Sequence, residues 1–249
     1  MNLPQLYKRY TDPNLALIYQ YGKVGSTALA YSIPGAVNVH DLYGNVMCPC
    51  GFRQRNSLAY RFAGFPLDRF LRRLIIKRRK SIDIVVPIRD PWERNISMFF
   101  EDLPFWFVHH FATKRANKKV EGLGLLKEIF SETFEHDGPD KWFQKEFCRF
   151  TGIGFDEINF DKSKGYLTIE KGKFRCLILT TQHFRSESGV PTIEEFLGRS
   201  FELTSRNSGD KKWYGTAYKD FLADEDFVAS YREKMMSSLV QQKFFSSDQ

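Results

Sequence analysis

The residues best suited to hold an anion lie in the stretch YGKVGSTAL. Gly22 and Gly25 allow a tight turn and let backbone N–H groups approach a ligand. Lys23 adds a point charge to the same turn, while Ser26 and Thr27 add two hydroxyl donors at the start of an expected helix. These residue types in this order indicate a cradle for a phosphate or a sulfate.

The stretch does not have the sequence pattern of an ATP-binding loop. Such a loop has four residues between its glycines and then Gly-Lys-Ser or Gly-Lys-Thr. Here the lysine precedes the second glycine, and the loop is shorter. A plain strand-to-helix turn with a solvated Lys23 is the alternative interpretation of these residues.

A second group of polar residues follows the apolar run VVPI, in the stretch RDPWERNIS. The guanidinium of Arg89 has the forked shape that matches a phosphate, and Ser97 adds a donor two helical turns later. Alternatively, Arg89 pairs with a structural carboxylate and Ser97 faces solvent.

If the bound anion donates a chemical group to an acceptor hydroxyl, a base is also needed to remove the proton of that hydroxyl. His40 follows an expected strand, and an imidazole can accept a proton near neutral pH. Asp41, the next residue, is the alternative base. The remaining histidines show no partner pattern and are expected to be structural: His109, His110, His136 and His183.

Apolar, β-prone segments and helical patterns alternate in the first 110 residues. We predict buried strands over 15–21, 36–40 and 82–89, and helices over 26–33 and within 54–80. Such alternation predicts a parallel sheet with helical crossovers.

The third strand is followed by Asp90 and Pro91, which suit the cap and the first position of a helix. Because ligands of parallel sheets bind at the carboxyl ends of the strands, Gly22, His40 and Arg89 are expected at one edge. Downstream we expect helices over 120–150, a hairpin-like pair of strands over 164–181, and helices again from about residue 210.

The bulk composition suits a soluble globular chain. The 249 residues are 42% hydrophobic, and residues 1–249 are expected to form a single domain. The net charge of +7 favours an anionic partner. No run has the length and apolarity of a membrane span or of a signal peptide, so a cytoplasmic location is expected. The four cysteines are expected to be free thiols, and no metal site is expected, although Cys48 and Cys50 form a tight pair.

Taken in order, the two anion motifs resemble those of sulfotransferases. YGKVGST is similar to their 5′-phosphosulfate loop, and RDPWERNIS is similar to their 3′-phosphate motif. The resemblance implies a three-layer, P-loop-NTPase-like α/β fold with a central, mainly parallel sheet and additional C-terminal helices. It also implies that 3′-phosphoadenosine 5′-phosphosulfate (PAPS) is the sulfuryl donor.

The later chain resembles a narrower group, the capsular polysaccharide synthesis family of sulfotransferase-like proteins. That likeness lies in residues 141–166, 175–184 and 206–221. It implies transfer of a sulfuryl group to a hydroxyl of a carbohydrate acceptor, in the modification of a capsular or surface polysaccharide.

The resemblance also assigns roles to residues. Lys23 would contact the sulfuryl group and the bridging oxygen, and would stabilise charge on the departing phosphate. Arg89 and Ser97 would hold the 3′-phosphate. The residues expected to bind the 5′-phosphosulfate are Gly22, Lys23, Val24, Gly25, Ser26, Thr27 and Ala28. A later segment that closes over the nucleotide matches here at Arg206, Asn207 and Lys212, although it lacks the Lys-Gly-Arg-like pattern of the family.

Residues 53–80 form the most basic segment, with ten Lys or Arg among 28 residues. A solvated helix face is one interpretation, and contact with an anionic glycan or a membrane surface is the other. Its aromatic residues are too sparse for a nucleic-acid platform.

Two rival functions stay open at the level of sequence. The first is an ATP- or GTP-dependent kinase-like enzyme, in which Asp90 would hold a metal ion. The second is a non-catalytic, glycan-binding relative of the fold.

Overall fold

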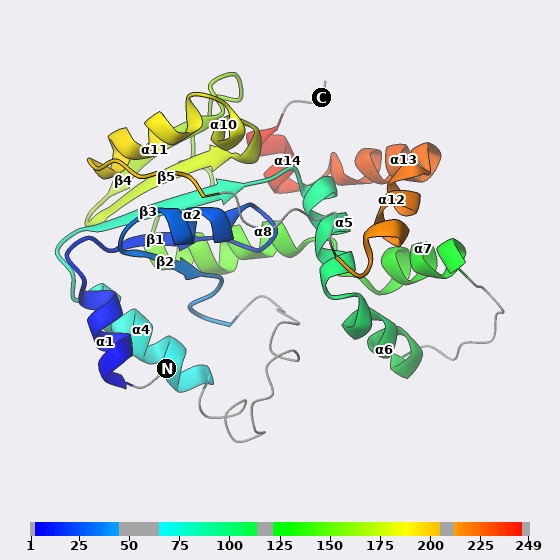
Figure 1. The fold of residues 1–249 in the computed structure, drawn as a ribbon, viewed down its shortest axis with the longest axis horizontal. Coiled ribbons are helices and arrows are strands. Elements are labelled where there is room, and N and C mark those ends of the chain that lie inside the picture. Colours follow the sequence, from blue (N-terminus) through cyan, green and yellow to red (C-terminus); the bar gives the residue numbers. More distant parts are fainter. Residues whose placement is uncertain (1–2, 45–64, 114–121, 205–211, 246–249) are drawn as a thin grey trace.

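The computed structural model describes residues 3–44, 65–113, 122–204 and 212–245. Its centre is a five-stranded sheet with the strand order β2-β1-β3-β5-β4 (Figure 1). Strands β2, β1, β3 and β5 are parallel, and β4 pairs antiparallel with β5 at one edge. The strands are β1 (Ala16–Tyr19), β2 (Ala36–Val39), β3 (Ile82–Ile88), β4 (Tyr166–Lys171) and β5 (Phe174–Thr180).

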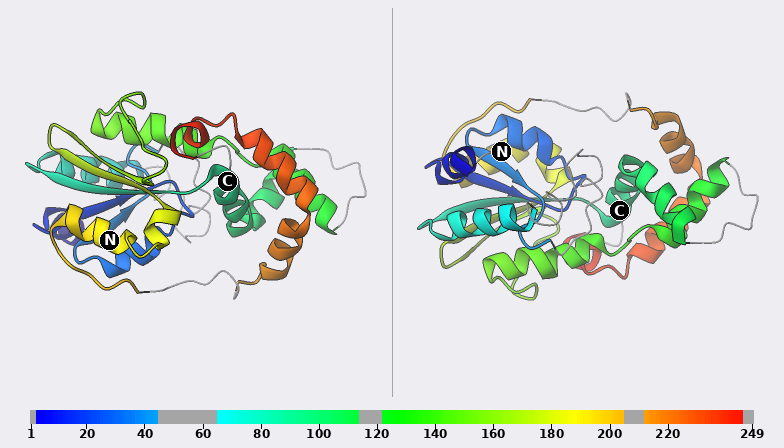
Figure 2. Two further views of the ribbon diagram at one scale, coloured as in Figure 1. Left: turned by 90° about the horizontal axis from the view of Figure 1, so that it is seen from above. Right: turned by 90° about the horizontal axis from the view of Figure 1, so that it is seen from below.

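Helices cover both faces of this sheet and continue beyond one end of it (Figure 2). The helices of the sheet layers are α1 (Leu3–Thr11), α2 (Ser26–Ser32), α4 (Phe65–Lys77), α8 (Gly138–Trp142), the π-helical segment η2 (Phe143–Cys148), α9 (Arg149–Thr151), α10 (Thr181–Arg185), α11 (Gly189–Leu197) and α14 (Leu239–Phe244). The remaining helices are α5 (Pro91–Glu101), α6 (Leu103–Thr113), α7 (Gly122–Thr133), α12 (Gly215–Ala223) and α13 (Glu225–Met235).

The alternation of side chains along β1 shows how the two faces are filled. Ala16 and Ile18 point into a cluster with residues of α2, α10 and α11. Leu17 and Tyr19 point into the opposite cluster, with residues of α1, α4, η2 and α14. All four side chains are fully buried, as a strand covered on both faces requires.

A third, aromatic cluster holds the helices beyond the sheet. Phe99 and Phe100 of α5 pack edge-on against each other at 5.3 Å, and Phe130 of α7 and Phe221 of α12 join them. Because α5 begins directly after β3, this cluster fixes the helix that leaves the carboxyl edge of the sheet.

The expected mainly parallel α/β sheet with C-terminal helices is confirmed. The strands expected over 15–21, 36–40 and 82–89 are present with shorter ends, and the hairpin-like pair of strands is β4 and β5. Sequence reasoning did not predict α1. Residues 54–64 of the region expected to be helical lie outside the described residues, and most of the rest of that region forms α4.

Among the described residues, no helix is long and apolar enough to cross a membrane. Cys148 and Cys176 are free thiols, as expected. Cys48 and Cys50 lie outside the described residues.

Candidate functional site

The loop between β1 and α2 has an unusual backbone. Gly22, Lys23 and Gly25 all have positive φ, at 91°, 64° and 76°. In the described chain, Lys23 is the one non-glycine residue with this conformation. A lysine in the left-handed region costs about 1 kcal/mol, and such outliers concentrate at functional sites.

Two arginines after β3 hold three successive carbonyl groups of this loop. Arg94 donates to the Tyr21 carbonyl at 2.6 Å and to the Gly22 carbonyl at 3.4 Å. Arg89 donates to the Lys23 carbonyl, also at 3.4 Å. In a trans peptide the following N–H points away from the carbonyl, so the N–H groups of Lys23 and Val24 point away from the arginines.

Those N–H groups are available to a ligand. From Lys23 to Thr27, five successive backbone N–H groups have no recorded acceptor in the parts of the chain that the structure describes. The groups on either side are bonded: Gly22 N–H donates to the Gln20 side chain, and Ala28 N–H donates to the Gly25 carbonyl at 3.2 Å. Helix α2 has only seven residues, so the loop itself is the main source of donors.

The expected anion-binding side chains meet along one side of α5. Glu93 accepts from Arg89 at 2.9 Å, and Glu101 accepts from Lys23 at 3.3 Å. Ser97 is half-buried and lies one turn from each glutamate, on the same side of the helix. The structure therefore brings Lys23, Arg89 and Ser97 to a common edge, as the sequence predicts.

Glu101 also ties the C-terminal part of the chain to the loop. Its Oε2 atom accepts from Tyr214 at 2.7 Å and forms an ion pair with Lys212. Burial lowers the pKa of Lys23 to about 8, with Glu101 opposing the shift and Lys212 adding to it. Burial also lowers the pKa of Lys212, but hydrogen bonds with Glu101 and Tyr214 outweigh it and raise this pKa.

A buried glutamine links the loop to the candidate base. Gln20 lies at the end of β1, fully buried, and its Oε1 atom accepts from Gly22 N–H. Its amide nitrogen donates to Asn38 at 3.0 Å and lies 3.1 Å from Nδ1 of His40. Asn38 donates in turn to the Ser26 hydroxyl at 3.3 Å. One polar network thus joins the first turn of α2 to the end of β2.

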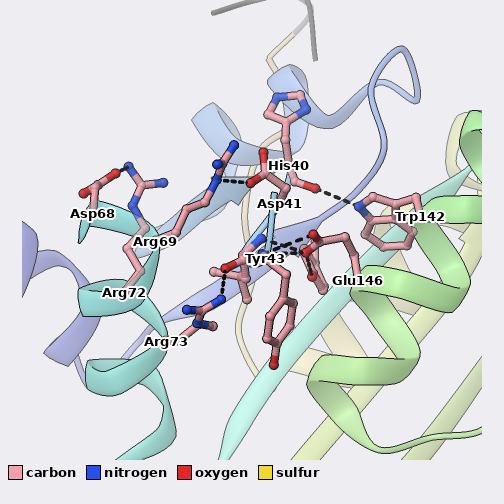
Figure 3. A network of polar contacts seen from close by, with 11 residues as sticks. His40, Asp41, Tyr43, Asp68, Arg69, Arg72, Arg73, Trp142 and Glu146 are labelled. Carbon is pink, nitrogen blue, oxygen red and sulfur yellow. Dashed lines mark hydrogen bonds and ion pairs between the residues drawn. The ribbon is translucent and has the colours of Figure 1, made fainter. Parts of the chain in front are cut away.

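His40 is held at its backbone carbonyl, and its ring lies next to the Gln20 amide. Trp142 of α8 donates to the His40 carbonyl at 2.7 Å (Figure 3). The residue as a whole is exposed, yet the protein atoms packed around the imidazole desolvate it and lower its pKa from the usual value; Asp41 opposes that shift and Arg94 adds to it. A neutral imidazole near pH 7 is the form that accepts a proton.

Asp41 has a different environment. It forms an ion pair with Arg69 of α4, and Figure 3 shows this pair on the side of α4, away from Trp142 of α8. The next turn is held by Glu146 of η2, a fully buried carboxylate that accepts from Leu42 N–H at 2.7 Å and from Tyr43 N–H at 3.1 Å. Glu146 therefore fixes the segment that carries His40 and Asp41.

Asp90 is used as the predicted helix cap. It accepts from Trp92 N–H at 3.1 Å and is 7% exposed. Burial raises its pKa to about 6, and the Trp92 hydrogen bond opposes this shift. Among the described residues, no group of three or more His, Cys, Asp or Glu is arranged to hold a metal ion.

Three of the other histidines have structural partners. His110 bonds to the Thr133 hydroxyl at 2.7 Å, His136 bonds to the Tyr231 hydroxyl at 2.9 Å, and His183 bonds to the Thr192 hydroxyl at 2.9 Å. Arg206 and Asn207, expected in the nucleotide-covering segment, lie outside the described residues.

Sequence reasoning missed Arg94, Gln20 and Glu101. Gln20 had a signal, because it is a polar residue in an otherwise apolar strand. Arg94 follows Arg89 by five residues, but its partners are carbonyl groups 72 and 73 residues earlier in the chain. No local pattern identifies such a contact.

The arrangement of these groups suits anion binding beside a potential base. Loop N–H groups and the ammonium of Lys23 suit one anionic group, and the guanidinium of Arg89 suits a second. Comparisons with known protein families, with curated proteins and with solved structures give no match to this chain.

Proposed function

We propose that this protein is a PAPS-dependent O-sulfotransferase with the sulfotransferase variant of the P-loop-like α/β fold. The observation that carries the proposal is the arrangement of the loop after β1. Its carbonyl groups are held by Arg94 and Arg89, and five successive N–H groups have no recorded acceptor in the described residues. A loop built in this way favours a compact, multiply charged oxyanion.

The distribution of cations fits a donor with two separated anionic groups. Lys23 lies in the loop itself, whereas Arg89 lies at the end of β3 and reaches the loop through the Lys23 carbonyl. Both cations are paired with glutamates of α5, so a bound dianion replaces those carboxylates as their partner. The residues expected to hold the donor are those of the loop 22–28 with Arg89, Ser97 and Lys212.

When bound, PAPS supplies the sulfuryl group, which moves to the acceptor oxygen while the bond to the bridging phosphate oxygen breaks. Lys23 stabilises the negative charge that develops beside the loop. His40 accepts the proton of the acceptor hydroxyl after the acceptor displaces the Gln20 amide nitrogen. This donor lies 3.1 Å and 3.2 Å from the two ring nitrogens and occupies the ring lone pair in this structure. The acceptor class we propose is a carbohydrate, in a capsular or surface polysaccharide.

A transfer assay tests this function. The protein is incubated with sulfur-labelled PAPS and a panel of glycans, lipid alcohols and small alcohols. Label should move to a carbohydrate hydroxyl, and Lys23→Ala should lower turnover by about 10²- to 10³-fold, as removal of one charge-stabilising donor does.

A matched control is Lys219→Ala, an exposed lysine of α12. Turnover of the control should equal that of the unaltered protein. Transfer of phosphate from labelled ATP in the presence of Mg²⁺, without transfer from PAPS, would contradict the proposal and favour the kinase-like alternative.

A further inference from the structure

Helix α4 has a second apolar side that does not face the core. Ile76 is fully buried against the sheet. Leu67, Phe70 and Leu74, by contrast, are 57%, 52% and 39% exposed. Their spacing of three and four residues places them in one stripe along the helix. A stripe of this size on a helix that already has a buried side needs an explanation beyond core packing.

A pocket lies at the end of this stripe. It has a volume of about 290 Å³ and is lined by Tyr43, Phe70, Arg73, Leu74, Lys77 and Arg149. The guanidinium groups of Arg73 and Arg149 lie 4.6 Å and 4.1 Å from the centre of the Tyr43 ring. Arg73 is also held by the Leu42 carbonyl at 2.7 Å, so at least this cation is fixed in place (Figure 3).

The charge around the stripe is strongly positive. Residues 65–80 contain seven Lys or Arg and a single carboxylate, Asp68. Asp68 is paired with Arg72. For the three cations of the pocket, Arg73, Lys77 and Arg149, no carboxylate partner is recorded among the described residues. The lining of the pocket is almost entirely apolar, so these three residues contribute their aliphatic stems to it and direct their charged groups elsewhere.

Helix α1 extends the same surface. It packs beside α4, as Figures 1 and 2 both show. Its Tyr7 is 57% exposed, and Lys8 and Arg9 lie in its last turn, also exposed. We call the exposed side of α1 and α4, with the pocket beside Tyr43, the basic-apolar face.

We propose that the basic-apolar face docks on an anionic lipid bilayer. The charged ends of Arg73, Lys77 and Arg149 would contact lipid phosphate groups, while Leu67, Phe70, Leu74 and the apolar pocket beside Tyr43 meet the boundary between headgroups and acyl chains. Aliphatic side chains flanked by cations are what an interfacial helix uses on an anionic membrane. A hydrated acidic glycan would gain little from Leu67 and Leu74, so the exposed leucines favour the bilayer.

Docking at this face does not require the proposed transfer reaction. It would place the candidate site close to the membrane, because Arg69 of α4 pairs with Asp41, the neighbour of His40. An enzyme in this position would act on molecules held at the bilayer surface.

Vesicle co-sedimentation tests the docking. Full-length protein is mixed with phosphatidylglycerol–phosphatidylcholine vesicles, with pure phosphatidylcholine vesicles, and with a soluble acidic polysaccharide. We expect salt-sensitive binding to the anionic vesicles. The double variant Lys77→Gln, Arg149→Gln should lower the partition coefficient about 30-fold, since each cation near an anionic surface contributes about a factor of five.

Two further variants make the result specific. Phe70→Ser with Leu74→Ser leaves every charge in place and should also weaken binding to anionic vesicles. Lys219→Gln with Lys234→Gln removes two exposed lysines of α12 and α13 and should leave binding unchanged. Absence of binding to anionic vesicles would overturn the proposal. So would an equal loss of vesicle binding in the Lys77, Arg149 variant and in the Lys219, Lys234 variant, or binding to the soluble polysaccharide alone. Far-ultraviolet circular dichroism of each variant excludes unfolding as the cause.

Discussion

The Nη2 atom of Arg94 lies 2.6 Å from the carbonyl oxygen of Tyr21, at the point where β1 ends and the candidate anion-binding loop begins. The Arg94 guanidinium also lies 5.5 Å from the centre of the Tyr21 ring, and the residue is only 4% exposed. Burial lowers its pKa to about 10, so it stays charged at neutral pH. A buried cation thus holds the backbone of the loop, while the N–H groups of Lys23 and Val24 point the other way.

Replacement of Arg94 by lysine should damage this loop. Arg94→Lys keeps the charge but loses the fork that reaches both the Tyr21 and the Gly22 carbonyl. We expect the free energy of unfolding to fall by roughly 2 kcal/mol, the usual contribution of hydrogen bonds to a charged group. We also expect weaker binding of 3′,5′-adenosine bisphosphate. Urea unfolding and calorimetric titration measure the two effects.

The comparison variant for this prediction is Arg89→Lys. Arg89 makes a single long hydrogen bond to the loop and an ion pair with Glu93. Its replacement should weaken nucleotide binding with a smaller loss of stability. If both variants lose stability equally and bind the nucleotide normally, Arg94 is a structural residue without influence on the loop.

Because Lys23 has a left-handed backbone conformation, two substitutions at this position distinguish effects on turnover from effects on stability. Lys23→Gly and Lys23→Ala both remove the ammonium group, so both should lower turnover about 100-fold or more. Only glycine adopts a φ of 64° without strain. We expect Lys23→Gly to be more stable than Lys23→Ala by about 1 kcal/mol in thermal unfolding. Equal stability of the two variants would show that the loop relaxes to another conformation.

The pH dependence of kcat/KM should have limits set by Lys23 and His40. The pKa of Lys23 is lowered to about 8, so the rate should fall as pH rises through about 8 and the ammonium loses its proton. On the acid side the rate should fall as His40 becomes protonated, below the usual histidine range because its pKa is lowered.

A variant assigns the alkaline limit to its residue. Lys23→Arg keeps the charge at every accessible pH, so the decline above pH 8 should disappear even if the maximal rate is lower. If the decline persists in this variant, it belongs to another group.

His40 and Asp41 are distinguished by how they affect rate and binding. His40→Gln should lower kcat by about 10²- to 10⁴-fold while nucleotide affinity stays unchanged, since the imidazole serves the acceptor. Asp41→Asn should lower stability through its pair with Arg69 but leave kcat near normal. A loss of kcat in Asp41→Asn alone would identify Asp41 as the base.

The strands, the glycine-rich loop and the cap of α5 were predictable because each depends on neighbours in sequence. Asp90 followed by Pro91 specifies a helix start, and the cap bond to Trp92 N–H is present. Parallel strands then place Gly22, His40 and Arg89 at one edge without further information.

Long-range polar contacts were beyond sequence reasoning. Glu146 holds the segment after β2 from a helix more than 100 residues later. Glu101 contacts both Lys23, 78 residues earlier, and Lys212, 111 residues later. In the sequence, acidic residues of this kind cannot be distinguished from ordinary solvent-exposed residues of a helix. Only the fold shows that they face buried N–H groups or cations.

The most direct measurement is the thermal stability of the protein with two nucleotides. At 100 times its dissociation constant, a ligand adds about 2.7 kcal/mol, which for a chain of this size raises the melting temperature by about 5–10 °C. We predict this shift with 3′,5′-adenosine bisphosphate without Mg²⁺, and its loss in Lys23→Ala and Arg89→Ala. No shift with this nucleotide, together with a clear shift with ATP and Mg²⁺, would contradict the proposed function.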